Sequence, residues 1–292
     1  MSPIEIKCVQ QANALLGEGP TWSSADNVLY WVDIKRPAIF RWNPLQGQTG
    51  LWPMPQPVGF ASPAQRDRLV FGDAEGFGFL DLNTGQIARV ADPESDIPQN
   101  RFNDGKVDRR GRVWAGTMND HGPEPTGSLY RLDPDGSIRR MVTGIICSNG
   151  LGWSPDNRIM YYTDSMVRTI WAYEFDLETG ALGDRRVFAK LEENDGFPDG
   201  LTVDSEGFVW SAVWNGWRVI RYAPDGTIER TIHMPVQRPS SCMFGGPDLK
   251  TLYITSACVE LGWDALKKGP LAGSLFALST EVAGLPEVPF GG

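Results

Sequence analysis

Histidine is nearly absent from this sequence, and cysteine is scarce. The chain of 292 residues has only two histidines, His121 and His233, and four cysteines without CxxC spacing. A Ser-His-Asp triad or an imidazole-rich zinc site would have to use one of these two histidines, which largely excludes both classes of enzyme. The cysteines are expected to be reduced, partly buried thiols; they are Cys8, Cys147, Cys242 and Cys258.

Long apolar runs and basic clusters are missing as well. No stretch approaches the length of a membrane span, and the N-terminal MSPIEIKCVQ has charges too early for a signal peptide. The net charge is −9 and no basic stripe is present, so nucleic acids and anionic membranes are not expected partners. The expected location is the cytoplasm.

No long amphipathic helix pattern is found, but a short β-rich pattern repeats six times. Each copy has a polar turn with Asp, Asn or Gly, followed by a five-residue run rich in apolar and β-branched residues. The copies recur about every 40 to 50 residues. They cover residues 22–33 (WSSADNVLYWVD), 62–73 (SPAQRDRLVFGD), 107–117 (VDRRGRVWAGT), 153–164 (WSPDNRIMYYTD), 203–213 (VDSEGFVWSAV) and 245–256 (GGPDLKTLYITS).

A second hairpin-like unit follows each copy, so every repeat offers about four short strands. Four strands at this period predict an all-β fold, a six-bladed β-propeller with four-stranded antiparallel blades around a central channel. A large sandwich needs no regular repeat and solenoid rungs are shorter, which disfavours both alternatives. Residues 1–292 are expected to form a single domain, with the strand-like run Ile4–Gln10 completing the last blade. Most of the 11 tryptophans are expected in the core between blades.

One position in the repeat suggests a ligand site on the propeller axis. In a propeller the first strand of each blade lines the channel, and the loops that lead into these strands form one mouth. Four residues before each repeat start stand, in chain order, Glu18, Val58, Asn103, Asn149, Asp199 and Ser241. Four of these side chains have a carboxylate or amide oxygen, in similar glycine-containing turns. Such residues also cap ordinary turns, but their recurrence at the same position in four blades favours a binding site.

Oxygen ligands without thiolate or imidazole suit a hard divalent cation. Glu18 and Asp199 would supply its counter-charge, with Asn149 and Asn103 as further oxygen ligands. Ca²⁺, Mg²⁺, Mn²⁺, Fe²⁺ and Zn²⁺ all accept such ligands, and the pattern does not choose between them.

The motifs around these positions resemble one protein family along the whole chain. They are GEGPTW (17–22), RFNDGKVD (101–108), WAGTM (114–118), SNGLGWSPD (148–156), FPDGLTVDSEG (197–207) and GGPDLKTLYIT (245–255). They resemble the regucalcin/gluconolactonase family, also called the senescence-marker-protein family. The resemblance implies a six-bladed propeller with one catalytic divalent metal on its axis that hydrolyses sugar lactones to aldonic acids.

The resemblance also implies roles for individual residues. The metal ligands would be Glu18, Asn149 and Asp199, with Asp199 also the catalytic base. Arg101 and Asn103 would contact the substrate, although residue patterns alone leave Asn103 open between metal and substrate. Where members near regucalcin have a glutamate-rich loop after the WAGTM segment, this chain has Asn119-Asp120-His121, and Asp120 is the expected acidic substrate contact. His121 is expected to be a solvated loop residue rather than a base.

Three other functions remain open on the sequence. The first is calcium binding with a regulatory role, the second a phosphotriester or organophosphate hydrolase on the same fold, and the third a scaffold for protein partners. Two carboxylates beside Arg101 and Asn103 at one mouth favour chemistry over scaffolding, because a scaffold needs no polar axial ring.

Overall fold

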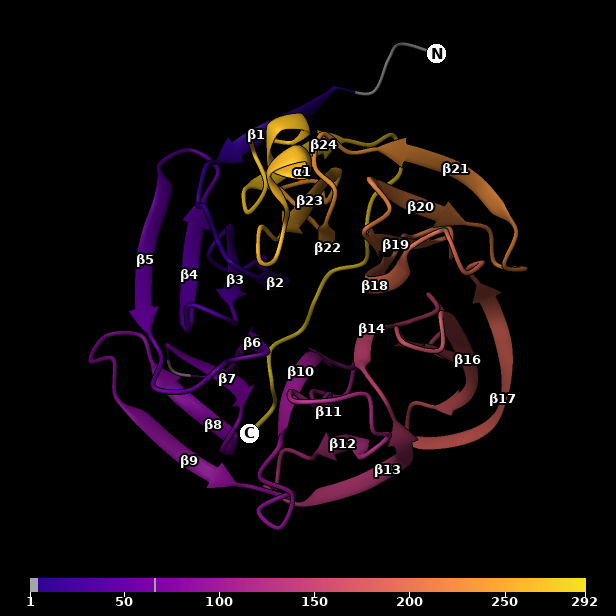
Figure 1. Ribbon diagram of the computed structural model, residues 1–292. Coiled ribbons are helices and arrows are strands. Elements are labelled where there is room, and N and C mark those ends of the chain that lie inside the picture. The colour runs from indigo at the N-terminus through magenta and orange to yellow at the C-terminus, as the bar shows by residue number, and fades with distance from the viewer. Residues whose placement is uncertain (1–4, 66) are drawn as a thin grey trace.

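Six four-stranded antiparallel sheets are arranged around a central axis in a computed structural model that describes residues 5–65 and 67–292 (Figure 1). The predicted six-bladed β-propeller is therefore confirmed. The innermost strands, β2, β6, β10, β14, β18 and β22, contact one another around the axis. Nearly all of their residues are buried, since each strand has the channel on one side and its own blade on the other.

The strands of each blade follow one another along the chain from the axis outward. Blade 1 contains β2 (Gly17–Ser23), β3 (Val28–Asp33), β4 (Ala38–Asn43) and β5 (Gly47–Pro53). Blade 2 contains β6 (Phe60–Pro63), β7 (Arg68–Asp73), β8 (Gly76–Asp81) and β9 (Ile87–Ala91). Blade 3 contains β10 (Asn100–Val107), β11 (Val113–Asn119), β12 (Gly127–Leu132) and β13 (Ile138–Ile145).

The next two blades repeat this order, and blade 6 differs in one strand. Blade 4 contains β14 (Ser148–Trp153), β15 (Ile159–Asp164), β16 (Thr169–Asp176) and β17 (Ala181–Lys190). Blade 5 contains β18 (Phe197–Val203), β19 (Val209–Trp214), β20 (Arg218–Tyr222) and β21 (Ile228–His233). Blade 6 contains β22 (Pro239–Gly245), β23 (Thr251–Ser256) and β24 (Leu275–Ser279), and its outer strand is β1 (Ile6–Gln10).

The outer strand of blade 6 joins the two ends of the ring. β1 pairs antiparallel with β24, for example Cys8 with Phe276, so the first and last strands of the chain share one sheet. Ile4, which the sequence analysis included in this strand, lies outside the described residues. In the described part of the chain the only helix is α1 (Trp263–Lys268), and no helix there is long and apolar enough to cross a membrane.

Large aromatic side chains fill the space between blades. Trp22 of blade 1 stacks on Tyr253 of blade 6 with ring centroids 5.7 Å apart, and Phe77 of blade 2 lies 4.3 Å from Phe102 of blade 3. Burying rings of this size is the main stabilising contribution between sheets that share few backbone hydrogen bonds. Tryptophan mostly follows the expected pattern, but Trp263 on α1 is 79% exposed.

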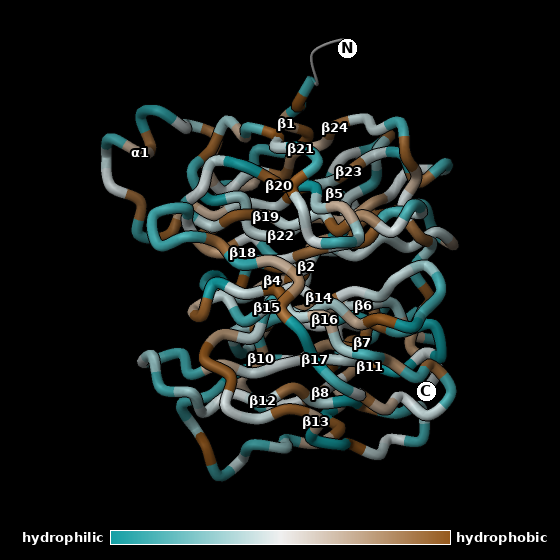
Figure 2. The backbone as a smooth tube through the Cα atoms, turned by 90° about the vertical axis from the view of Figure 1, so that its right-hand side faces the viewer, coloured by the Kyte–Doolittle hydropathy of each residue, from teal (hydrophilic) through white to brown (hydrophobic). Residues whose placement is uncertain are grey.

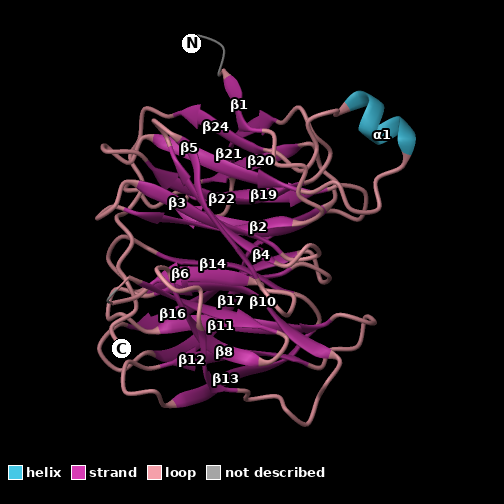
Figure 3. Ribbon diagram, turned by 90° about the vertical axis from the view of Figure 1, so that its left-hand side faces the viewer, coloured by secondary structure: helices cyan, strands magenta, loops and turns pink. Residues whose placement is uncertain are grey.

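The two ends of the channel differ. The connection that contains α1 lies on one face of the disc and the C-terminus lies on the other (Figures 2 and 3). The segment after β24 crosses that second face (Figure 1). Its backbone bonds in turn to the β22–β23, β18–β19, β6–β7 and β10–β11 turns, through Gly284–Leu249, Ser205–Ala283, Phe290–Pro63 and Gly291–Gly111. This tail therefore spans the channel end opposite the loops that lead into the innermost strands.

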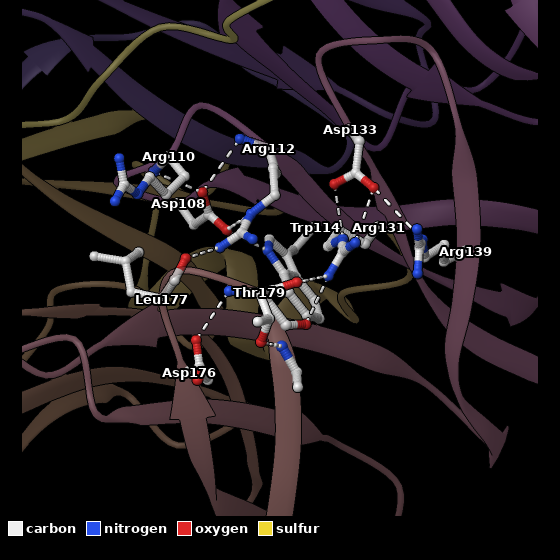
Figure 4. A network of polar contacts seen from close by, with 12 residues as sticks. Asp108, Arg110, Arg112, Trp114, Arg131, Asp133, Arg139, Asp176, Leu177 and Thr179 are labelled. Atoms are coloured by element: carbon white, nitrogen blue, oxygen red, sulfur yellow. Dashed lines mark hydrogen bonds and ion pairs between the residues drawn. The ribbon is translucent and has the colours of Figure 1, made fainter.

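Two hairpins at the tail side each contain a buried aspartate that accepts several hydrogen bonds. Asp108, after β10, accepts hydrogen bonds from Arg112 Nε (2.7 Å) and Trp114 Nε1 (2.8 Å) (Figure 4). Asp204 occupies the same place after β18 and accepts from Trp210 Nε1 (2.9 Å) and Arg221 Nη2 (2.7 Å). Both carboxylates also accept backbone N–H groups of their own turn. These aspartates hold the VDxxGxVW hairpins in shape.

Candidate metal centre

The polar axial residues lie within strands, and this differs from the sequence analysis, which placed them in turns. Five innermost strands have an irregularity in their pairing at these residues, as expected of β-bulges that redirect a side chain. The register shifts between Glu18 and Thr21, Phe102 and Gly105, Asn149 and Leu151, Pro198 and Leu201, and Pro239 and Ser241. β6 pairs with β7 without a shift, and its blade has the apolar Val58 at this position.

Glycines beside the polar residues serve close contact between neighbouring innermost strands. A Cβ on Gly150 would lie 2.5 Å from the carbonyl oxygen of Asp199 on the next blade. A Cβ on Gly200 would lie 2.0 Å from Ser241 Oγ on the blade after that. Both distances are far below van der Waals contact, so only glycine lets the innermost strands approach closely enough to bring their polar side chains to one axis.

Glu18 and Asp199 are buried carboxyl groups, and no Lys, Arg or His side chain in the described part of the chain forms an ion pair with either. Burial, followed by the charges of Asp199 and Asp104, raises the pKa of Glu18 well above its usual value. Burial and the charge of Asp104 raise the pKa of Asp199 in the same way. Glu18 Oε2 accepts only the adjacent Gly19 N–H (3.1 Å), and Asp199 Oδ1 has no hydrogen-bond partner among the described residues. A buried, unpaired carboxylate is costly unless a cation neutralises it.

Asn149 is held on the same axis by a short chain of hydrogen bonds. Its Nδ2 donates to Ser165 Oγ (3.1 Å), and that hydroxyl donates to the carbonyl of Pro198 (2.7 Å), next to Asp199. Because the amide nitrogen faces Ser165, the Oδ1 atom, which accepts the Gly150 N–H at 3.1 Å, remains available as an oxygen ligand.

Asn103 is more fully engaged than Asn149. Its Oδ1 accepts from Arg101 Nη1 (2.7 Å), and its Nδ2 donates to the carbonyl of Ser148 (2.7 Å) on the next blade. Arg101 is itself buried and also donates through Nε to Asp120 Oδ1 (2.7 Å). The structure thus brings Arg101, Asn103 and Asp120 together at the mouth, bonded to one another.

Two charged residues of the centre were not assigned a site role from the sequence. Asp104 is buried in the same bulge as Asn103, and burial raises its pKa to about 6. Its charge acts on both Glu18 and Asp199. Lys106 is buried further along β10 and donates from Nζ to the carbonyl of Leu201 (3.3 Å). Asp104 follows Asn103 directly in the FNDG motif, so its position could have been noticed in the sequence. That both side chains are buried at the axis depends on the bulge, which the sequence does not show.

Other polar or reactive groups are not candidate ligands. His121 is exposed, as expected for a loop residue. Burial raises the pKa of the Cys147 thiol to about 12, and its sulfur lies 3.6 Å from Met118 Sδ. The Trp214 ring is covered by the Arg238 guanidinium, which lies 4.6 Å from its centroid.

The centre is not a cage of carboxylates. No group of three or more His, Cys, Asp and Glu side chains within residues 5–65 and 67–292 is arranged to hold a metal ion. A site here would combine two carboxylates with amide oxygens, which is chemistry that Ca²⁺ and Mg²⁺ accept. A surface cavity of about 900 Å³ lies elsewhere, beside β1 and β23, and its Arg221 is already paired with Asp204. The unpartnered oxygen of Asp199 is the feature that fits a cation.

Comparison with known proteins agrees with the fold and the motifs. Residues 16–258 match the family model described as SMP-30/Gluconolactonase/LRE-like region. The chain belongs to this family. It is 39% identical over 296 residues to regucalcin of Danio rerio, which covers all of both chains.

Solved structures extend the likeness to two kinds of protein. The calcium-binding protein regucalcin of Agrobacterium tumefaciens is 29% identical, with a TM-score of 0.94, over 99% of this chain and 98% of that one. A gluconolactonase of Xanthomonas campestris is 26% identical, with a TM-score of 0.78, over 95% and 90%. Within the family, both lactone hydrolysis and calcium binding are thus represented.

Proposed function

We propose that this protein is a divalent-metal-dependent lactonase that hydrolyses a sugar lactone to the corresponding aldonic acid. The observation that carries the proposal is the buried Oδ1 of Asp199, which has no partner among the described residues and lies near two further carboxyl groups. The family supports the reaction class, since a gluconolactonase shares the fold and a quarter of the sequence.

The residues that would hold a divalent cation are Glu18, Asn149 and Asp199. All three are buried at bulges or bulge edges of innermost strands that face one axis. A bound cation would supply a Lewis acid for the lactone carbonyl. A ligand set made only of oxygen atoms favours the harder cations Ca²⁺ and Mg²⁺ over Mn²⁺, Fe²⁺ and Zn²⁺. Affinity measurements with the five ions would identify the native one.

The protein's own side chains divide the remaining work. Asp199 accepts a proton from the water that adds to the carbonyl carbon. The ring C–O bond then breaks, and the leaving oxygen takes up a proton, which leaves an aldonate. Arg101 donates hydrogen bonds to sugar hydroxyls or the new carboxylate, while Asn103 and Asp120 complete the substrate side. Asn103 is assigned to the substrate rather than the metal because its Oδ1 is bonded to Arg101.

We place the protein in the cytoplasm, because its four cysteines are all unpaired thiols, which suits a reducing compartment. Its partner in this proposal is a small sugar lactone, with no role for nucleic acid or membrane.

The test is a pH-indicator assay on gluconolactone, xylonolactone, arabinolactone and galactonolactone, with and without chelator. Wild-type protein should hydrolyse at least one lactone in a chelator-sensitive way. Asp199→Ala should lower kcat/KM by roughly a thousandfold, the range of a lost general base, and should abolish tight metal binding in calorimetry. Full activity of this folded variant, or of a rigorously metal-free preparation, would refute the proposal.

A second function has support in one observation. The Agrobacterium neighbour is described as a calcium-binding protein, and the axial oxygen set suits that ion. Tight calcium binding with no turnover of any lactone in the same assay would favour a regulatory calcium-binding protein.

A further inference from the structure

Lys35 makes a contact at the channel mouth that reaches across the ring. It lies in the β3–β4 loop of blade 1, and its Nζ is 3.0 Å from Asp120 Oδ1 and 2.9 Å from Asp120 Oδ2. Asp120 follows β11 in blade 3, 85 positions along the chain. The ion pair therefore joins two blades that are separated in the ring by blade 2.

Asp120 is shared between two cations. Arg101 Nε donates to the same Oδ1 atom at 2.7 Å. The two contacts differ in exposure, because the arginine side chain is buried and the lysine side chain is not. Burial acts to raise the pKa of Asp120, but the Arg101 charge and the Lys35 hydrogen bond outweigh it and hold the pKa below the usual value. Asp120 is therefore a permanent anion at neutral pH.

The same contacts fix the guanidinium of Arg101. Its Nε is used on Asp120, and its Nη1 on the Phe102 carbonyl (3.1 Å) and Asn103 Oδ1 (2.7 Å). In the described part of the chain no hydrogen bond is made by its Nη2. One edge of the planar fork is thus clamped, and the free donor is the part left for a bound molecule.

The fold itself has little need of Lys35. Its side chain is 36% exposed, against 4% for Arg101, and exposed ion pairs contribute only about 0.2–1 kcal/mol to stability. The loop backbone is held independently, since Asp33 Oδ1 accepts the Arg36 N–H at 3.0 Å. Blade 2 offers the apolar Val58 at the axial position, so it supplies no axial polar side chain between Lys35 and Asp120.

We propose that Lys35 is a positioning residue for lactone binding, which clamps Asp120 against Arg101 so that an acceptor and a donor face the hydroxyl groups of the substrate together. The inference rests on the proposed lactonase function and deepens it. Lys35 does not take part in the chemical step, so its loss should weaken binding of the ground state and transition state alike. Such a loss raises KM and leaves kcat in place.

The kinetic test compares Lys35→Met with Lys35→Arg, which retains the charge. Lys35→Met should raise KM roughly threefold to fivefold, the equivalent of one exposed ion pair, with kcat within about twofold. Lys35→Arg should restore KM to within about twofold of wild type. Lys7→Met is the matched control, since it removes the same charge from a lysine that is 65% exposed on β1 and is paired with Glu5. An unchanged KM in Lys35→Met would overturn the proposal.

A second readout needs no turnover. The Nε proton of Arg101 can be followed by nitrogen-15 NMR, and its exchange with water should be faster in Lys35→Met than in wild type or Lys7→Met, because Asp120 is held less firmly. Equal exchange rates overturn the proposal even if the enzyme is active. If wild type hydrolyses no lactone, the lactonase function fails, whereas faster exchange in Lys35→Met still supports the clamp.

Discussion

Asp199 and Asp204 lie five positions apart on the same hairpin and occupy opposite ends of the channel. Both are buried aspartates next to a glycine-containing segment. Asp204 accepts two backbone N–H groups, the Trp210 indole and the Arg221 guanidinium. Asp199 Oδ1 has no partner in the part of the chain that the structure describes. The hydrogen-bonding capacity of Asp204 is filled by the protein, whereas Asp199 keeps an oxygen that a ligand can use.

The same difference separates the two mouths as a whole. At the tail side, Asp108 and Asp204 are paired with arginines, and the C-terminal segment covers the turns. At the other side, Glu18, Asp104 and Asp199 are buried together. Besides burial, the charges of Asp199 and Asp104 raise the pKa of Glu18, and the charge of Asp104 raises the pKa of Asp199. Burial of like charges costs free energy of folding, and proteins retain such a cost mainly at functional sites. Polar residues on the axis thus indicate a functional site only when their carboxylates lack pairing cations within the protein.

The largest effect on stability is expected at the saturated end. Asp204→Asn removes the fully buried carboxylate that pairs with Arg221. Glu206 and Glu229 remain paired with this guanidinium, so the expected cost is at the low end for a broken buried pair, about 3 kcal/mol. Urea unfolding of the metal-free protein should show this loss. The matched variant Asp199→Asn should lose none, because it removes an unpaired charge. Equal destabilisation by the two substitutions would mean that Asp199 is a structural residue like Asp204.

The sequence predicted the strands well because their signal is local. Turn residues at fixed spacing identified six repeats, and the early strand predicted to complete the last blade does pair with β24. The axial position was also found by counting, and Glu18, Asn149 and Asp199 do lie on innermost strands. Their roles as ligands stay predictions.

What the sequence did not reveal depends on contacts between blades. The bulges at Glu18 and Asp199 were taken for turns, since a glycine beside an acidic residue is typical of both and only the pairing partner separates them. Asp120 was expected to be a substrate contact, yet its carboxylate is bonded to Lys35 from a distant blade. No local pattern encodes a side chain that crosses the ring.

A substitution in the C-terminal tail offers a second test of whether the two channel ends differ in function. Phe290 is buried between blades 2 and 3, with its ring centroid 5.8 Å from that of Phe79. Phe290→Ala should lower the free energy of unfolding by about 3 kcal/mol, as expected for loss of a buried ring. Because this contact lies at the end away from the candidate centre, KM should not change. Leu45→Ala, at a residue 95% exposed, is the neutral control. A raised KM in Phe290→Ala would show that the two mouths are coupled.

The smallest expected effect is a pH dependence of the folding stability that comes from the unpaired carboxyl groups at the candidate metal centre. In the metal-free protein, burial raises the pKa of Asp104 from 3.8 to about 6, and burial and neighbouring carboxylates raise the pKa values of Glu18 and Asp199 well above their usual values. The folded state then holds protons that the unfolded chain has released, so the contribution of these three groups to stability is greatest below about pH 4 and declines as pH rises through the raised values. The share of Asp104 is about 2 kcal/mol between pH 4 and about 6.

Urea unfolding in chelator across this pH range measures the slope, and Asp104→Asn should flatten the part between pH 4 and 6. Calcium should reverse the trend, because a cation binds the deprotonated carboxyl groups and stabilises the folded state more as pH rises. Leu45→Ala should keep the wild-type slope, since it removes no titratable group and Leu45 is 95% exposed. A slope that calcium does not change would show that the carboxyl groups at this mouth are not cation ligands.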